Sequence, residues 1–183
     1  MEQWSIVWCG TRMEPFGTLS EERRPGLLIL AVGNPSRGDD ALGPLLLERL
    51  AAERERSGQW SDVELLTDFQ LQIEHAVDLE KRDLVLFVDA SVSGPPPYEF
   101  TRLRPARDAS YTSHALTPAA VLHVYEQINP TTPPPAFLLA IRGQSFALGE
   151  PLSPAAAANL VAALDFVGRL LERRDAESWA RSL

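Results

Sequence analysis

Two adjacent carboxylates, Asp39 and Asp40, end a segment at residues 33–40 that follows an apolar stretch and contains two glycines. Carboxylates can bind a metal ion or act as a general acid and base. They also cap helices, and the sequence leaves both roles open for each residue, with Asp39 the better candidate for capping alone. The segment lacks the glycine pattern of a dinucleotide-binding loop and the Gly-Lys-Ser/Thr of a phosphate-binding loop. A nucleotide-binding domain is therefore not favoured.

Further polar residues stand where other apolar stretches end. Asp68 and Asp89 each follow such a stretch, and His114 lies in an irregular segment just before a stretch of helical period. One histidine and two carboxylates from separate loops suit a divalent transition metal with open positions, or a water activated by a carboxylate. Gln70 and Gln72 could orient a substrate or begin a helix. We expect Asp89 to hold a neighbouring loop by hydrogen bonds.

The other histidines and nucleophiles lack this placement. His75 and His123 fall within stretches of helical period, where we expect packing or surface roles. Cys9 lies near the N-terminus, away from any predicted strand end. No serine lies in the G-x-S-x-G pattern of a nucleophile elbow. A covalent mechanism is therefore the weaker hypothesis.

Alternating apolar and helical stretches predict the elements that must position these groups. We expect buried strands at 27–32, 63–67, 84–88 and 136–141, and an edge strand at 98–103. We expect helices at about 39–56, 71–79, 117–127 and 153–173. Uniformly apolar strands separated by helices predict an α/β fold, a single three-layer α/β/α domain with a mostly parallel central sheet. Sites in such sheets form outside the carboxyl ends of the strands.

Composition narrows the class of protein further. The 183 residues include 17 Lys or Arg and 25 Asp or Glu, giving a formal charge of −8. Nucleic acid is therefore not expected as a partner, and no apolar run approaches the roughly 20 residues that span a bilayer. One cysteine favours a reducing cytoplasm. We expect a monomer with an irregular arm at 1–25, one domain at 26–175 and a tail at 176–183.

Several separated motifs occur in an order that resembles one known family. They are Gly33-Asn34-x-x-x-x-Asp39-Asp40-x-x-Gly43, Asp68, Val88-Asp89-Ala90, Ser113-His114-x-Leu116-x-Pro118, and the stretch from Gly143-x-Ser145 to Leu152-Ser153-Pro154. Together, over about residues 27–171, they resemble the [NiFe]-hydrogenase maturation endopeptidases.

The resemblance implies a cytoplasmic protease that removes the C-terminal extension of a hydrogenase large-subunit precursor after nickel insertion. It implies that Asp40, Asp68 and His114 form the catalytic site and contact nickel supplied by the substrate. The family often has Glu where this chain has Asp40, and an ungapped alignment places Thr67 at the position assigned to Asp68. Whether a carboxylate or the metal activates water stays open. The alternative is a non-catalytic chaperone that senses the metal centre during hydrogenase assembly.

Overall fold

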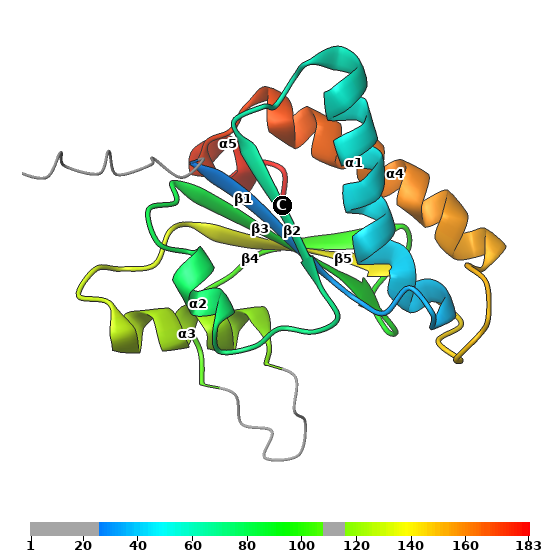
Figure 1. Ribbon diagram of the computed structural model, residues 1–183, viewed down its shortest axis with the longest axis horizontal. Coiled ribbons are helices and arrows are strands. Elements are labelled where there is room, and N and C mark those ends of the chain that lie inside the picture. The colour runs from blue at the N-terminus through cyan, green and yellow to red at the C-terminus, as the bar shows by residue number, and fades with distance from the viewer. Residues whose placement is uncertain (1–25, 108–115) are drawn as a thin grey trace, which may run out of the picture.

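The computed structural model describes residues 26–107 and 116–183 (Figure 1). Its strands are β1 (Leu27–Val32), β2 (Val63–Asp68), β3 (Leu84–Ser91), β4 (Tyr98–Arg102) and β5 (Ala136–Arg142). Its helices are α1 (Leu42–Ser57), α2 (His75–Asp78), α3 (Pro118–Ile128), α4 (Pro154–Glu172) and α5 (Ala176–Ala180), with a 3-10 turn, η1 (Gly38–Ala41), before α1.

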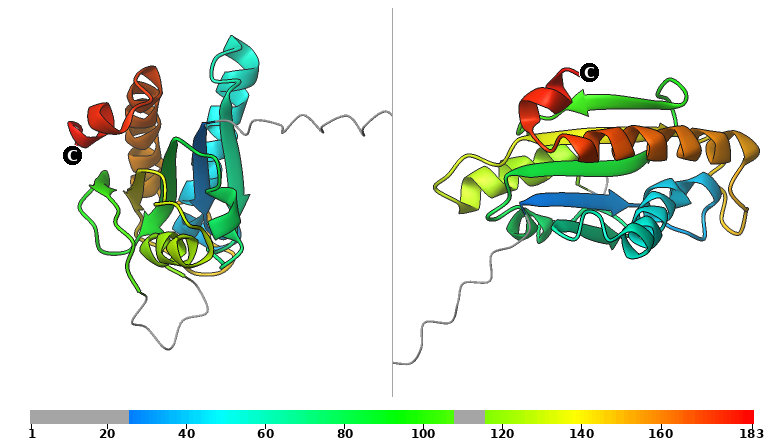
Figure 2. Two further views of the ribbon diagram at one scale, coloured as in Figure 1. Left: turned by 90° about the vertical axis from the view of Figure 1, so that its left-hand side faces the viewer. Right: turned by 90° about the horizontal axis from the view of Figure 1, so that it is seen from above.

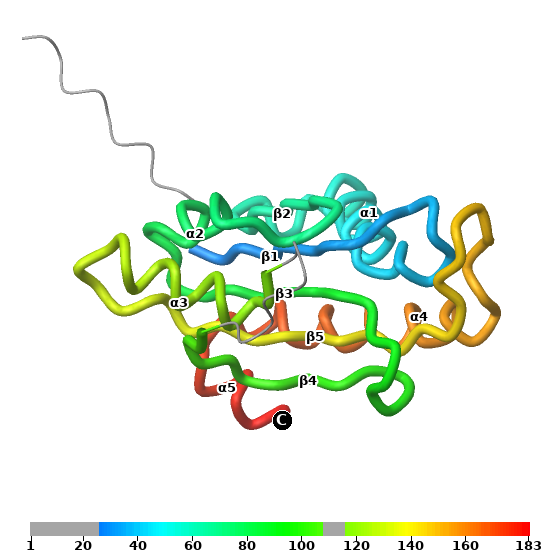
Figure 3. The backbone as a smooth tube through the Cα atoms, turned by 90° about the horizontal axis from the view of Figure 1, so that it is seen from below, coloured from blue at the N-terminus to red at the C-terminus, as the bar shows by residue number. Residues whose placement is uncertain are grey.

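The five strands form one sheet in the order β2-β1-β3-β5-β4, which Figure 3 shows from one strand to the next. Only β4 runs antiparallel to its neighbour. Figures 1 and 2 show α1 and α4 on one face of the sheet and α2 and α3 on the other. The predicted three-layer, mostly parallel α/β fold is thus confirmed.

Alternating side chains of the strands build a core on each face. Ile29, Leu86 and Leu139 pack with α1 and α4 in one core. Leu28, Val85 and their neighbours pack with α2 and α3 in the other. Because both faces are covered, the inner strands consist of continuous apolar residues. Along these strands, the polar residues at the carboxyl ends are therefore the first that are partly exposed to solvent.

The segment before α1 differs from the prediction. Capping was one of the two roles left open for Asp39 and Asp40, but both residues lie inside η1, and neither η1 nor α1 has a side-chain cap at its N-terminus. The carboxylates instead accept hydrogen bonds from other loops, described below. Pro44 does fall in the first turn of α1, where proline needs no intrahelical partner for its nitrogen.

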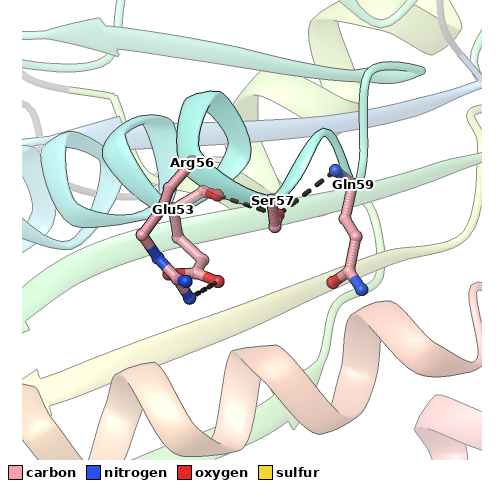
Figure 4. A network of polar contacts seen from close by, with 4 residues as sticks. All are labelled: Glu53, Arg56, Ser57 and Gln59. Carbon is pink, nitrogen blue, oxygen red and sulfur yellow. Dashed lines mark hydrogen bonds and ion pairs between the residues drawn. The ribbon is translucent and has the colours of Figure 1, made fainter.

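The C-terminal end of α1 lies far from this segment. Ser57 Oγ donates to the carbonyl of Glu53 at 2.8 Å and accepts from the N–H of Gln59 at 3.2 Å, and Arg56 forms a surface ion pair with Glu53 (Figure 4). The 16 residues of α1 span about 24 Å. Glu53 is therefore a carboxylate well separated from the carboxyl ends of the strands.

The second predicted helix is shorter than expected. A helix over 71–79 was predicted, but α2 comprises only His75–Asp78. The N–H of Gln72 donates to Nδ1 of His75 at 2.9 Å, so a side chain holds the preceding residues in turns. Of the packing and surface roles left open for His75, its burial favours packing.

The expected tail at 176–183 is in fact part of the packed domain. It contains α5, in which Trp179 is only 1% exposed, and the indole Nε1 donates to the carbonyl of Leu170 at 3.0 Å. The ring lies edge-on to Phe137, with centroids 5.5 Å apart. A large aromatic side chain with a satisfied N–H stabilises a core in this way.

By length and composition, α4 is the one helix in residues 26–107 and 116–183 that could cross a membrane. Its seven buried residues, which include Leu160 and Val167, face the core. An apolar core helix meets the same criteria.

Candidate active site

Asp39 joins the loop after β1 to the loop after β5. Its side chain is inaccessible to solvent. Oδ2 accepts from the N–H groups of Gln144 (2.6 Å) and Ser145 (3.0 Å) and from Oγ of Ser153 (2.8 Å). Oδ1 accepts from the N–H of Ser153 at 2.7 Å. Since Ser153 is the N-cap of α4, one carboxylate fixes the start of that helix and both loops.

The electrostatics of Asp39 fit a structural role. Burial alone would raise the pKa of its carboxyl group, but the hydrogen bonds from Gln144, Ser145 and Ser153 outweigh burial and lower the pKa below its usual value. Donors aimed at a carboxylate stabilise its charged form. Because both oxygens of Asp39 already accept hydrogen bonds that hold the loops in place, we assign this residue no role in the chemistry.

Asp40 is held differently, by the turn that follows β1. Gly33 has a φ of +145°, and a Cβ at this position would collide with the backbone carbonyl of Asp40. Glycine is therefore required for this close approach. Beside it, the N–H of Asn34 donates to Oδ2 of Asp40 at 2.9 Å, so one oxygen of the half-buried carboxylate is oriented by the backbone.

Asp89 is the carboxylate that the structure brings to Asp40. It lies on β3, which continues to Ser91 and so carries Asp89 inside the strand. Burial and the negative charge of Asp40 raise the pKa of Asp89 to about 6, although a hydrogen bond from Ala90 N–H partly offsets them. That hydrogen bond reaches Oδ1 at 2.7 Å. A carboxyl group with this pKa can exchange a proton near neutral pH.

Asp68 and Asp89 lie level with each other on the sheet. Val32 of β1 pairs with Asp68 of β2, and Ala31 pairs with Val88 of β3, so Asp89 lies level with Val32. The alternation of side chains places both aspartates on the face covered by α2 and α3, two strand spacings or about 10 Å apart. Asp40, Asp68 and Asp89 therefore line the carboxyl end of β1 from three different segments.

The Asp68 carboxylate is oriented by a buried imidazole. Its Oδ2 lies 3.4 Å from Nε2 of His75, and its Oδ1 accepts from the N–H of Phe69 at 2.6 Å. Because Nδ1 of His75 accepts from Gln72 N–H, the proton of the neutral ring is on Nε2, facing Asp68. Sequence reasoning missed this pair, since it gave His75 only a packing or surface role.

Two of the three predicted site residues, Asp40 and Asp68, thus flank the end of β1, whereas His114 lies outside the described residues. Gln70 and Gln72 line a cavity of about 390 Å³ with Ile73, Glu74 and Leu116, which places both near the site without a contact to its carboxylates. The proposed contacts of Asp40, Asp68 and His114 with nickel stay predictions.

Asp89 is the residue that the sequence analysis undervalued. Its signal was a carboxylate directly after five buried residues of a strand. Burial is the main cause of its raised pKa and the charge of Asp40 adds to it; Asp40 becomes its neighbour only because β1 and β3 pair. After β1 the chain moves to one side of that strand to form β2, and after β2 it moves to the other side to form β3. Ligands bind α/β sheets where such a reversal opens a crevice.

These carboxylates are spread along the sheet edge rather than gathered around one point. In residues 26–107 and 116–183, no three His, Cys, Asp or Glu side chains form a group that could hold a metal ion. Oxygen ligands of this kind still suit a divalent cation that arrives with other ligands in place.

The fold matches that of solved hydrogenase maturation proteases. The [NiFe] hydrogenase maturation protease HycI from Thermococcus kodakarensis KOD1 is 26% identical, with a TM-score of 0.61 over 81% of this chain and 94% of that chain. An Escherichia coli endopeptidase solved in solution is 25% identical, with a TM-score of 0.60 over 80% and 92%. The hydrogenase maturating endopeptidase HybD from E. coli is 24% identical, with a TM-score of 0.59 over 80% and 92%.

No protein-family model matches the chain, and no curated protein matches it in sequence. The class defined by the fold is nevertheless specific. The chain has the fold of the hydrogenase maturation proteases, and the resemblance predicted from its motifs is confirmed.

Proposed function

We propose that this protein is an endopeptidase that removes the C-terminal extension of a [NiFe]-hydrogenase large-subunit precursor after nickel insertion. The observation that carries the proposal is the pairing of Asp40 with Asp89 beside β1, in the fold of hydrogenase maturation proteases. The single cysteine of the chain supports a cytoplasmic site of action, where thiols stay reduced.

The Asp40–Asp89 pair supports hydrolysis by acid and base catalysis. With a pKa of about 6, Asp89 is largely ionised at pH 7 yet basic enough to take a proton from an attacking water. The protonated carboxyl group can then give that proton to the nitrogen of the leaving amine. Burial mainly keeps the pKa of Asp89 high. Asp40 adds to this effect through its charge and presents its remaining oxygen to the water.

The acidic rim supports selection of a metal-loaded substrate. Asp40 and Asp68 lie on either side of the Gly33 turn, because Gly33 N–H donates to the Asp68 carbonyl at 3.1 Å and Asn34 N–H donates to Asp40. A precursor that brings a cationic nickel centre would neutralise these carboxylates, whereas an unloaded precursor would leave their charges without a counter-ion. His114 is proposed as the third contact to the substrate's metal.

Incubation of the protein with a nickel-loaded large-subunit precursor tests the proposal, with the intact mass of the precursor as the readout. We expect the loaded precursor to lose a C-terminal peptide and the nickel-free precursor to keep its mass. Binding of the loaded precursor without any loss of mass would instead identify a chaperone that senses the metal centre. Absence of both binding and shortening would overturn the proposed function.

A further inference from the structure

The outer edge of β2 presents main-chain groups that no described strand uses. β2 is the first strand of the sheet and pairs only with β1 in the part of the chain that the structure describes (Figure 3). The carbonyl of Asp68 accepts from Gly33 N–H, so the main-chain groups of Asp68 point toward β1. Since these directions alternate along a strand, those of Leu65 and Thr67 point outward.

Other residues already occupy the start of this edge, whereas no residue in 26–107 or 116–183 forms a main-chain hydrogen bond to its end. The N–H of Val63 donates to the carbonyl of Trp60 at 3.0 Å, and Arg54 Nη1 donates to the carbonyl of Val63 at 3.0 Å. These contacts terminate the edge at Val63. The outward N–H and C=O groups of Leu65 and Thr67 lie between that closed end and the carboxylate site.

A small cavity continues the edge toward the site. About 170 Å³ in volume, it is lined by Gly33, Pro35, Pro44, Thr67, Asp68 and Phe69. The side chain of Phe69 is 67% exposed and that of Ile73 is 61% exposed, so apolar surface lies just beyond Thr67. Prolines and an exposed phenylalanine suit an apolar side chain of a bound chain.

We propose that an extended segment of the substrate protein, next to the bond to be cut, adds to the outer edge of β2 as a further strand. This inference rests on the proposed function, and it assigns the occupant as the precursor chain itself. Main-chain hydrogen bonds to Leu65 and Thr67 would supply affinity, and the cavity by Pro35 and Pro44 would take one apolar side chain.

The geometry also sets the distance from this strand to the bond to be cut. A strand added to β2 lies three strand spacings, or about 14 Å, from Asp89 on β3. At about 3.3 Å for each extended residue, roughly four residues cross the carboxyl ends of β2 and β1 before the chain reaches Asp89. The segment beside Leu65 and Thr67 would therefore lie about four residues from the cleaved bond.

Amide hydrogen exchange measured residue by residue tests this placement. The protease variant Asp89→Asn, which keeps the proposed nickel contacts Asp40 and Asp68, is used to prevent turnover, with and without saturating nickel-loaded precursor. We expect the amides of Leu65 and Thr67 to become at least tenfold slower in the complex, while those of Glu64 and Leu66, which face β1, stay slow in both states. Binding of the precursor with unchanged exchange at Leu65 and Thr67 would overturn the inference and leave the proposed function intact.

A matched pair of substitutions gives a second readout. Leu65→Pro removes one outward N–H and keeps the ladder to β1, whereas Leu65→Val keeps the N–H. We expect Leu65→Pro to weaken precursor binding at least tenfold and Leu65→Val to stay within about twofold. Equal binding by the two folded variants would contradict the inference. Protection that grows with protease concentration in the absence of precursor would also contradict it, because a second copy of this chain would then be the occupant.

Discussion

Beyond the larger effect of burial, the charge of Asp40 raises the pKa of Asp89, and this relationship joins a turn after β1 to a strand that follows it by more than 40 residues in the sequence. The backbone fixes both partners, since Asn34 N–H donates to Asp40 and Ala90 N–H donates to Asp89. Each carboxyl group is thus held in place by a neighbouring backbone N–H. The proposed hydrolysis depends on these two carboxyl groups.

Removal of one charge should change the titration of the other group. We expect Asp40→Asn to lower the pKa of Asp89 from about 6, because burial would remain while the repulsion between like charges would be lost. NMR titration of the carboxyl carbon of Asp89 measures this directly. Glu53→Gln, at the far end of α1 (Figure 4), is the matched control and should leave the titration unchanged. An unaltered pKa in Asp40→Asn would show that the two carboxylates do not interact.

The raised pKa of Asp89 also predicts how stability varies with pH. Between about pH 4 and pH 6 the folded protein binds a proton at Asp89 that the unfolded chain has lost, so the free energy of unfolding falls as pH rises through this range. Asp89→Asn removes this dependence and can still accept from Ala90 N–H. Relative to the wild type, we expect the free energy of unfolding of the variant to increase by roughly 3 kcal/mol more at pH 8 than at pH 3.5. Urea unfolding at both pH values measures the difference. An equal increase in stability at the two pH values would contradict a raised pKa of Asp89.

Asp39 should matter for stability rather than for proton transfer. Asp39→Ala leaves the N–H groups of Gln144, Ser145 and Ser153 without their acceptor, which we expect to cost on the order of 3 kcal/mol at pH 7. Because the pKa of Asp39 is lowered, its contribution is present above the usual carboxyl pKa and is lost as pH falls through the lower folded value. Chemical denaturation of Asp39→Ala gives the cost. Asp62→Asn removes an exposed ion pair with Arg174 and should cost under about 1 kcal/mol; similar losses in both variants would refute the loop-fixing role.

The C-terminal helix should prove to be part of the cooperative domain. Trp179→Ala removes a ring that is 1% exposed, and buried Trp to Ala changes cost about 3–5 kcal/mol. We expect the variant to unfold at a lower urea concentration than the wild type and in a single transition, because α5 and the rest of the domain unfold together. Wild-type stability in Trp179→Ala would mean that α5 does not pack on Phe137 and Leu170 in solution.

The layered fold could be predicted because burial on both faces of a parallel sheet makes its strands apolar without interruption, as in residues 27–32 and 84–88. The short helix α2 could not, because a side chain, His75, satisfies a backbone group that a longer helix would have used. The packing of α5 was equally hidden, since it depends on one tryptophan meeting a core built by distant strands.

The site was predictable in part for similar reasons. A carboxylate directly after an apolar stretch marks the end of a strand, so Asp68 could be placed at this edge of the sheet from the sequence. Asp40 could be placed there because it ends the glycine-containing segment that follows residues 27–32. The sequence could not show that Asp39 has a structural role and Asp40 does not, because the hydrogen bond to Asp39 comes from Gln144, 105 residues away. The importance of Asp89 depends on the pairing of β1 with β3, which no local pattern encodes.

The most direct test of the central claim is the initial rate at which the nickel-loaded precursor loses its C-terminal peptide, followed by intact mass. Loss of a positioned acid or base typically slows a reaction 10²–10⁴-fold, so we predict at least a hundredfold slower shortening by Asp40→Asn and by Asp89→Asn. The control Glu53→Gln should shorten the precursor at the wild-type rate. Shortening by Asp89→Asn at the wild-type rate would contradict the assignment of the Asp40–Asp89 pair as the catalytic centre.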